Sequence, residues 1–185
     1  MRERMLAGDL YLAGGEELSQ LSRAALELMA AYNATTVRQV EERRRLLGEL
    51  LGSVGEGTDI RPPLYVDYGA HITVGADTFI NFGLVALDVA KISIGDDVQM
   101  GPNVQLLTPT HPIEPDLRRQ KWEAAKPIVV GSNVWLGGGV IVLRGVTIGE
   151  NSVVGAGAVV TRDLPPNVVA VGNPARVIRV LDEAP

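Results

Sequence analysis

Two histidines, His71 and His111, are the only imidazole side chains in the sequence of 185 residues. A neutral imidazole accepts a proton near neutral pH, so either residue could serve as a general base. The sequence contains no cysteine, which excludes thiol nucleophiles, zinc-thiolate sites and disulfides. His111 is the stronger candidate because it lies in a segment that interrupts a regular repeat. A histidine in such a proline-rich loop can equally be a packing group, and we expect that simpler role for His71.

The repeat around His111 has a period of six residues. An aliphatic residue recurs at every sixth position, and these positions are Val130, Leu136, Val142, Ile148, Val154 and Val160. Upstream, the same frame contains Val74, Ile80, Ile94 and Met100. This spacing does not follow the 3.6-residue turn of a helix, and glycines are scattered through the repeat. Short strands joined by tight turns, three to a triangular coil, would stack the aliphatic side chains into one core.

Two segments of the sequence depart from the repeat. Apolar residues between Leu18 and Tyr32 and between Val37 and Leu51 follow helical spacing, which predicts two amphipathic helices that cap the coils or line a substrate site. Between residues 108 and 127 the hexads stop while Ile94 and Val130 stay in phase, which predicts an extruded loop. We therefore expect a helical cap (1–55), a β-helix domain (56–170) with this loop, and a C-terminal tail (171–185).

Composition narrows the classes of function. Lys and Arg total 17 against 22 Asp and Glu, a net charge of −5, which disfavours a nucleic-acid partner. No signal-peptide core follows the N-terminus, and no run of 18 apolar residues suggests a membrane span. We expect a cytoplasmic protein with no membrane partner.

Several motifs resemble those of a known family. The hexads, Thr110-His111-Pro112-Ile113, the segment from Gly131 to Gly137 and the ending from Gly172 to Ile178 are similar to the hexapeptide-repeat acetyltransferases. The likeness is greatest to the maltose, galactoside and nodulation-factor group of O-acetyltransferases, and it covers nearly the whole chain.

This resemblance implies a mainly β fold, a left-handed parallel β-helix, assembled as a homotrimer with active sites between neighbouring subunits. It implies acetyl-CoA as cosubstrate and a sugar as acceptor, with no metal. His111 would be the general base that deprotonates a sugar hydroxyl, which then attacks the thioester directly. Backbone amides near the groove would stabilise the oxyanion.

The resemblance also assigns binding residues. Asn81 would lie near both the acetyl group and the acceptor. The other predicted acceptor contacts are Asp67, Asp88 and Glu123. The other predicted acetyl-CoA contacts are Trp135, Gly138, Ala156, Thr161, Arg162, Arg176 and Arg179. Simpler roles remain open: the two aspartates could be turn residues, Trp135 could be buried by the trimer, and Arg176 and Arg179 could be solvated surface residues.

Two departures from the family bear on the acceptor. Ala13 stands where the galactoside enzymes have an acidic residue, and Phe79 replaces an aromatic residue that carries a hydroxyl. These changes favour a maltose-like or glucose-like acceptor over a galactoside. A xenobiotic or other small hydroxyl acceptor, or a non-catalytic β-helix used for assembly, are the alternatives. A zinc site of the kind that uses three histidines is disfavoured because the chain has only two.

Overall fold

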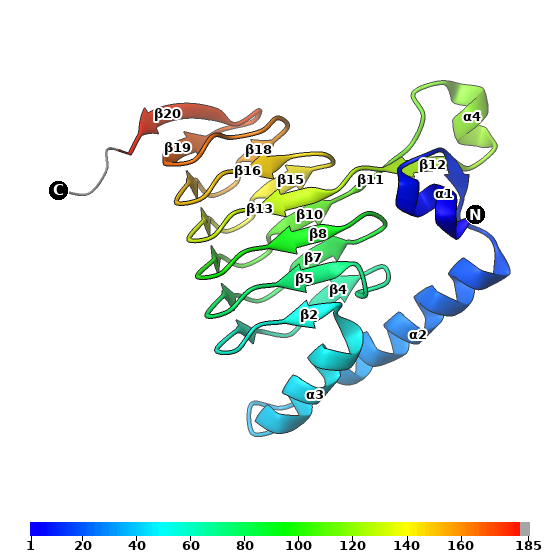
Figure 1. Ribbon diagram of the computed structural model, residues 1–185, viewed down its shortest axis with the longest axis horizontal. Coiled ribbons are helices and arrows are strands. Elements are labelled where there is room, and N and C mark those ends of the chain that lie inside the picture. Colours follow the sequence, from blue (N-terminus) through cyan, green and yellow to red (C-terminus); the bar gives the residue numbers. More distant parts are fainter. Residues whose placement is uncertain (182–185) are drawn as a thin grey trace.

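Parallel strands stack into a three-sided solenoid in the computed structural model of the protein, which describes residues 1–181 (Figure 1). Each side is one sheet whose strands come from successive coils. Face one contains β2 (Ser53–Val54), β5 (Ile72–Val74), β8 (Ile92–Ile94), β13 (Ile128–Val130) and β16 (Thr147–Ile148). Face three contains β4 (Leu64–Val66), β7 (Leu84–Leu87), β10 (Gln105–Leu107), β15 (Ile141–Leu143) and β18 (Val159–Val160).

Face two is the longest sheet. It contains β3 (Asp59–Ile60), β6 (Phe79–Ile80), β9 (Gln99–Met100), β14 (Trp135–Leu136), β17 (Val153–Val154), β19 (Val168–Val171) and β20 (Arg176–Val180). β20 turns back and pairs antiparallel with β19. Much of the segment expected as a tail therefore forms a hairpin, while residues 182–185 lie outside the described part of the chain.

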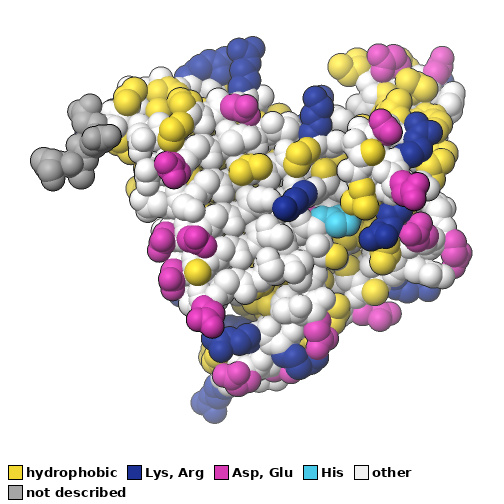
Figure 2. Space-filling model, viewed as in Figure 1, with side chains coloured by type: hydrophobic (Ala, Val, Ile, Leu, Met, Phe, Trp, Pro, Cys, Tyr) yellow, Lys and Arg dark blue, Asp and Glu magenta, His cyan; other side chains and the backbone are white. Residues whose placement is uncertain are grey.

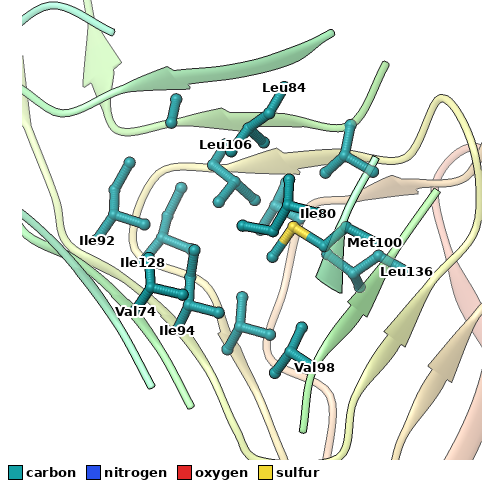
Figure 3. Packing of buried hydrophobic residues seen from close by; sticks show 14 of the residues in the cluster. Val74, Ile80, Leu84, Ile92, Ile94, Val98, Met100, Leu106, Ile128 and Leu136 are labelled. Atoms are coloured by element: carbon teal, nitrogen blue, oxygen red, sulfur yellow. The ribbon is translucent and has the colours of Figure 1, made fainter. Parts of the chain in front are cut away.

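The core runs through the centre of the solenoid. Ile72, Ile92 and Ile128 occupy paired positions on face one, and Ile80, Met100 and Leu136 do so on face two. Figure 3 shows side chains of this core converging from the three faces. The six aliphatic positions predicted from Val130 to Val160 are all buried, which confirms the prediction that the six-residue repeat forms one core. Burial of this continuous apolar column is the main stabilising contribution.

Three edges separate the faces. The loop edge, between faces three and one, comprises residues 67–71, 88–91, 108–127, 144–146 and 161–163. The glycine edge, between faces two and three, comprises residues 81–83, 101–104, 137–140 and 155–158. The acidic edge, between faces one and two, comprises residues 55–58, 75–78, 95–98, 131–134 and 149–152. Acidic side chains gather along this last edge, at the left of Figure 2.

Backbone contacts between coils determine which residues fit the glycine edge. A Cβ atom added to Gly137 would lie 2.5 Å from the backbone nitrogen of Ala156 in the next coil. A Cβ atom on Gly138 would lie 3.3 Å from Pro102 Cδ, a much milder contact. Gly139 turns the chain with φ of 70°, a value that favours glycine. Small residues therefore keep the later part of this edge, at residues 137–139 and 155–158, narrow and free of bulky side chains.

Three helices and a short strand precede the solenoid: α1 (Arg2–Ala7), β1 (Tyr11–Leu12), α2 (Glu16–Asn33) and α3 (Val40–Leu50). Leu46, Leu47 and Leu50 of α3 join the main core. The two predicted helices are present, but Val37 and Val40 are 79% and 60% exposed, so the apolar face of the second helix begins later than predicted. Within residues 1–181, none of the helices has the length and apolar content needed to cross a bilayer.

The predicted loop projects from the loop edge as a small subdomain (Figure 1). It contains β11 (Pro109–Thr110), α4 (Pro115–Arg119) and β12 (Trp122–Ala125). β12 lies between β11 and β1 in an antiparallel three-stranded sheet. The N-terminal segment thus supports the loop that carries His111.

Candidate active site

A cavity of about 570 Å³ lies at the loop edge, between α2 and the projecting loop. Three of the predicted site residues, His111, Asp67 and Glu123, line it together. They come from the projecting loop and from a turn two coils earlier, so the fold brings distant segments to one place. The cavity is large enough for a small sugar-sized molecule.

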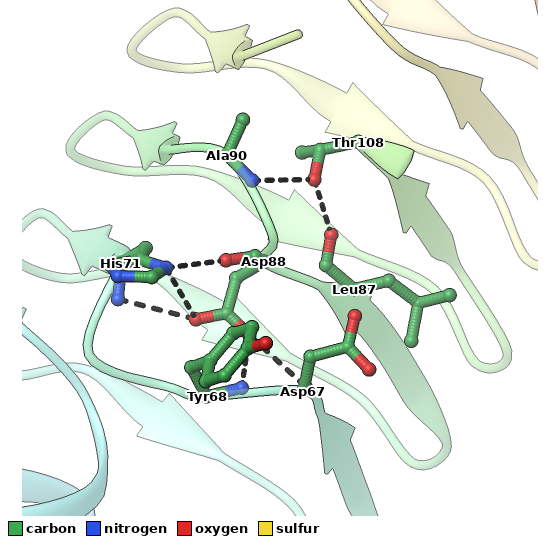
Figure 4. A network of polar contacts seen from close by, with 7 residues as sticks. All are labelled: Asp67, Tyr68, His71, Leu87, Asp88, Ala90 and Thr108. Carbon is green, nitrogen blue, oxygen red and sulfur yellow. Dashed lines mark hydrogen bonds and ion pairs between the residues drawn. The ribbon is translucent and has the colours of Figure 1, made fainter. Parts of the chain in front are cut away.

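His111 follows β11 directly, and the strand is fixed at its base. The hydroxyl of Thr108 donates to the carbonyl oxygen of Leu87 at 2.6 Å and accepts from the backbone nitrogen of Ala90 at 3.0 Å (Figure 4). The His111 side chain is exposed and makes no hydrogen bond to any residue in the described part of the chain. Its ring nitrogens are therefore available to a molecule in the cavity.

Asp88 plays a different part from the predicted one. Its side chain is fully buried, and its carboxylate accepts hydrogen bonds from the backbone nitrogens of Asp67 (3.1 Å), Tyr68 (2.9 Å) and His71 (3.2 Å). Figure 4 shows the Asp88 carboxylate beside the turn that carries Asp67 and Tyr68. With its oxygens occupied by the backbone, Asp88 lies behind the cavity wall and anchors the turn, so the predicted contact with an acceptor is not what the structure shows.

The same turn explains His71. Its Nδ1 lies 2.6 Å from the backbone oxygen of Asp88, and its ring packs against Tyr68 with 5.4 Å between ring centroids. This is the packing role expected from the sequence. The same turn places Asp67 in the lining of the cavity.

Asp67 and Glu123 give the cavity an acidic wall. Burial, reinforced by the nearby carboxylates of Asp88 and Glu123, raises the pKa of Asp67 to about 6. The hydroxyl of Tyr11 donates to Oε2 of Glu123 at 2.8 Å. Burial and this acidic neighbour raise the pKa of Tyr11, and burial also raises the pKa of Tyr68.

The remaining predicted residues lie elsewhere on the solenoid. Asn81, Gly138 and Ala156 follow one another up the glycine edge. Thr161 and Arg162 are exposed on the loop edge, above the coil that carries the projecting loop. Face three, with strands of two to four residues, separates the two edges by roughly 10 Å at about 3.3 Å per residue. One chain therefore does not bring Asn81 to His111.

Three further predicted cofactor residues lie on face two. Trp135 points outward from β14, and the residue is 57% exposed. Arg176 and Arg179 are exposed on β20, at the end of the solenoid away from α3 (Figure 1). None of the three lines the cavity that contains His111.

Several cavity residues were not predicted individually. Tyr11, Tyr68 and Arg23 line the cavity, and α2 also contributes Ser19 and Ser22, which fits the substrate-lining role expected for the helices. Ala13 lines the cavity as well, so its lack of a carboxylate alters the wall directly. Phe79 instead lies on face two, where the Arg61 guanidinium stacks 4.7 Å from the centroid of its ring. Among residues 1–181, no group of three or more His, Asp or Glu side chains is placed to hold a metal ion.

Comparison with known proteins gives this architecture its class. Residues 4–55 match the family described as maltose acetyltransferase hexapeptide capping motif, and residues 127–162 match bacterial transferase hexapeptide (six repeats). The galactoside O-acetyltransferase of Escherichia coli is 42% identical over 99% of this chain and 90% of its own length. Nodulation protein L of Rhizobium meliloti is 47% identical over 95% of this chain and 96% of its own length.

Solved structures agree with this result. A galactoside acetyltransferase in complex with coenzyme A superimposes with a TM-score of 0.96, covering 99% of this chain and 92% of that one at 42% identity. A maltose O-acetyltransferase from Clostridium difficile gives a TM-score of 0.91, covering 98% and 97% at 43% identity. The solenoid is thus a left-handed β-helix like those of the hexapeptide acetyltransferases. The chain belongs to the hexapeptide-repeat acetyltransferases, in the group of maltose and galactoside O-acetyltransferases.

Proposed function

We propose that this protein transfers an acetyl group from acetyl-CoA to a hydroxyl group of a sugar, with His111 as general base. The observation that carries the proposal is the cavity that His111, Asp67 and Glu123 line together. Family membership supports acetyl transfer, and the similarity to a structure with coenzyme A supports acetyl-CoA as the donor. The departure at Ala13, which lines the cavity, favours a maltose-like or glucose-like ring as the acceptor.

In this mechanism His111 takes the proton from the acceptor hydroxyl as the oxygen attacks the thioester carbonyl. The bond from that carbonyl carbon to sulfur breaks, and the proton held by His111 passes to the departing thiolate. The acetyl group moves in one transfer between two bound molecules, with no residue acylated. Polar side chains of the cavity orient the sugar so that one hydroxyl lies within hydrogen-bond reach of His111.

The glycine edge suits the donor. Gly138 and Ala156 leave a strip with no large side chain, along which a slender pantetheine arm can approach the backbone. Arg176 and Arg179 offer guanidinium groups for the nucleotide phosphates at the far end. In a homotrimer, Thr161 and Arg162 on the loop edge of a neighbouring copy would flank the same path. Trp135 would pack beside the arm. We place the activity in the cytoplasm, and fractionation of the host cell would test that placement.

The separation of the two edges supports a homotrimer. The outward side chains of face three are mainly apolar, among them Tyr65, Val85, Leu107, Ile141 and Leu143, whereas those of face one are mainly Ser and Thr. Burying this apolar face against neighbouring copies would be favourable. A closed ring of three would bring the loop edge of one copy to the glycine edge of the next. Asn81 of one subunit would then reach the acceptor beside His111 of another.

A complementation assay tests the transfer and the shared site together. His111→Ala disables the loop edge, and Ala156→Phe blocks the glycine edge. Each variant alone is expected to be nearly inactive in acetyl-CoA-dependent release of thiol with glucose and maltose. When the two are unfolded and refolded as a 1:1 mixture, random trimers should recover about a quarter of native activity, because that share of interfaces joins two intact edges. No recovery would show that each chain carries a complete site.

A further inference from the structure

The cavity beside His111 carries an excess of negative charge. The described residues that line it include two carboxylates, Asp67 and Glu123, and a single guanidinium, that of Arg23. With neutral His111, the lining therefore has a net charge of −1. Tyr11, Tyr68 and the buried Asp88 are the other titratable groups around Asp67, and none of them is a cation.

These carboxylates have no cationic partner within residues 1–181. The Asp67 carboxylate makes neither a hydrogen bond nor an ion pair with any residue in the described part of the chain, although it is half-buried. Glu123 accepts its one hydrogen bond from the neutral hydroxyl of Tyr11. Arg23 is exposed on α2 and lies within 4.0 Å of no carboxylate among the described residues. A partly dehydrated carboxylate without a partner is costly to maintain in a stable fold.

The kind of acceptor decides whether this charge is compensated. A neutral sugar entering the cavity would displace water from both carboxylates and bring no counter-charge. A sugar that carries an ammonium group would supply the missing charge and donate charge-assisted hydrogen bonds. We infer that the acceptor is an amino sugar, whose ammonium group is bound by Asp67 and Glu123 while a hydroxyl of the same ring is presented to His111. This inference rests on the proposed function and narrows its substrate class.

The same contact would direct the acetyl group to oxygen. A protonated amine has no free electron pair and does not attack a thioester. By holding the nitrogen as ammonium, the acidic wall leaves the hydroxyl beside His111 as the nucleophile. Selection of substrate and selection of the acetylated atom would thus come from one pair of side chains.

The test compares two acceptors that differ at one position: methyl 2-amino-2-deoxyglucoside and methyl glucoside, each with acetyl-CoA at pH 7. Reductive methylation at mildly acidic pH before mass spectrometry separates the two products of the amino glycoside: the ester keeps a free amine that is methylated, whereas the amide nitrogen is not. The variants are Asp67→Asn and Glu123→Gln, which keep shape and remove charge, with Glu27→Gln on the exposed surface of α2 as the control. Calorimetry with each glycoside measures binding independently of turnover.

The native protein is expected to form ester from the amino glycoside with a kcat/KM about 10- to 100-fold above that for the neutral one. Asp67→Asn should reduce this ratio at least tenfold and raise the share of amide, whereas Glu27→Gln should keep the native ratio. Equal use of the two glycosides, or a preference that survives in Asp67→Asn, would overturn the inference and leave the O-acetyltransferase standing. Binding selective for the amino glycoside without ester formation would support the inference and refute the proposed transfer.

Discussion

The Tyr11 hydroxyl donates a 2.8 Å hydrogen bond to Oε2 of Glu123, joining residues 112 positions apart in the sequence. The bond lies in the sheet where β1 pairs with β12, with Tyr11 opposite Glu123. β12 also pairs with β11, the strand that ends one residue before His111. Met5, Leu18 and Ala125 pack around the same sheet in a second apolar cluster. The N-terminal segment therefore sets the position of the candidate base.

Tyr11→Phe should lower kcat several-fold while the KM for acetyl-CoA changes little, because the loop and Glu123 lose an anchor whereas the glycine edge is untouched. Tyr32→Phe is the matched control: it removes another buried tyrosine hydroxyl, which donates to the carbonyl oxygen of Ile60 away from His111. Both variants should be destabilised by about 1 kcal/mol. Steady-state kinetics in which both changes lower kcat equally would show that the Tyr11 effect is only one of stability.

His111→Ala should reduce kcat by about 10²- to 10⁴-fold with acetyl-CoA binding retained, because the variant lacks only the proton acceptor. His71→Asn is the control, because His71 packs against Tyr68 and Asp88 in the turn at residues 67–71 and has a structural role. That change should lower the melting temperature more than His111→Ala does. Near-native turnover by His111→Ala would remove this residue from the mechanism.

The variants Gly137→Ala and Gly138→Ala change neighbouring residues, and we expect one to affect the stability of the fold and the other the binding of acetyl-CoA. A methyl group at position 137 would meet the backbone of Ala156 at 2.5 Å, so this change should destabilise the fold by roughly 1–3 kcal/mol or more. A methyl group at position 138 would meet Pro102 at 3.3 Å and should leave the melting temperature nearly unchanged. It should instead raise the KM for acetyl-CoA. An unchanged KM in Gly138→Ala would place the donor elsewhere.

The raised pKa of Asp67 predicts an unusual dependence of the free energy of unfolding on pH. Its pKa is about 6 in the folded protein, above the ordinary aspartate value of ~3.9. At pH values between these two, the folded chain holds a proton that the unfolded chain has lost. The stability from this group is therefore present below about pH 4 and is lost as the pH rises through 6.

It follows that Asp67→Asn should raise the melting temperature at pH 8 by roughly 2–4 °C, which corresponds to about 1 kcal/mol in a chain of this size. The advantage should shrink at pH 5, where Asp67 in the native protein is largely protonated. Calorimetric scans at the two pH values measure this difference. An equal or larger advantage at pH 5 would contradict the assigned direction. The preference for an amino glycoside should also weaken below pH 6.

The solenoid was predictable because one period governs it. Side chains alternate between core and surface in short strands, so an aliphatic residue at every sixth position defines the buried column. The loop was predictable for the same reason, since it breaks a frame that resumes at Val130. His111 could be proposed from its place in the loop together with family resemblance, whereas Asp67 could be proposed from the resemblance alone.

The parts of the structure that were not predicted depend on contacts between segments far apart in the sequence. α1 and β1 are short, and β1 exists through its pairing with β12, so local sequence carried little signal for them. Asp88 could not be distinguished from a cavity residue because an aspartate at a turn can face solvent or cap backbone nitrogens. Only the folded turn shows that three amides occupy its carboxylate.

The projecting loop leaves the coil without disturbing it. Leu106 of β10 lies level with Ala86 and Val142, and Ile128 of β13 lies level with Ile92, so the coils before and after the loop remain in register. The next coil crosses the same edge with the short turn at Arg144 and Gly145. The solenoid and the loop that carries His111 are therefore structurally independent. A short turn in place of the loop would leave the stacked coils intact, and a different loop at this position would give the same scaffold a different substrate.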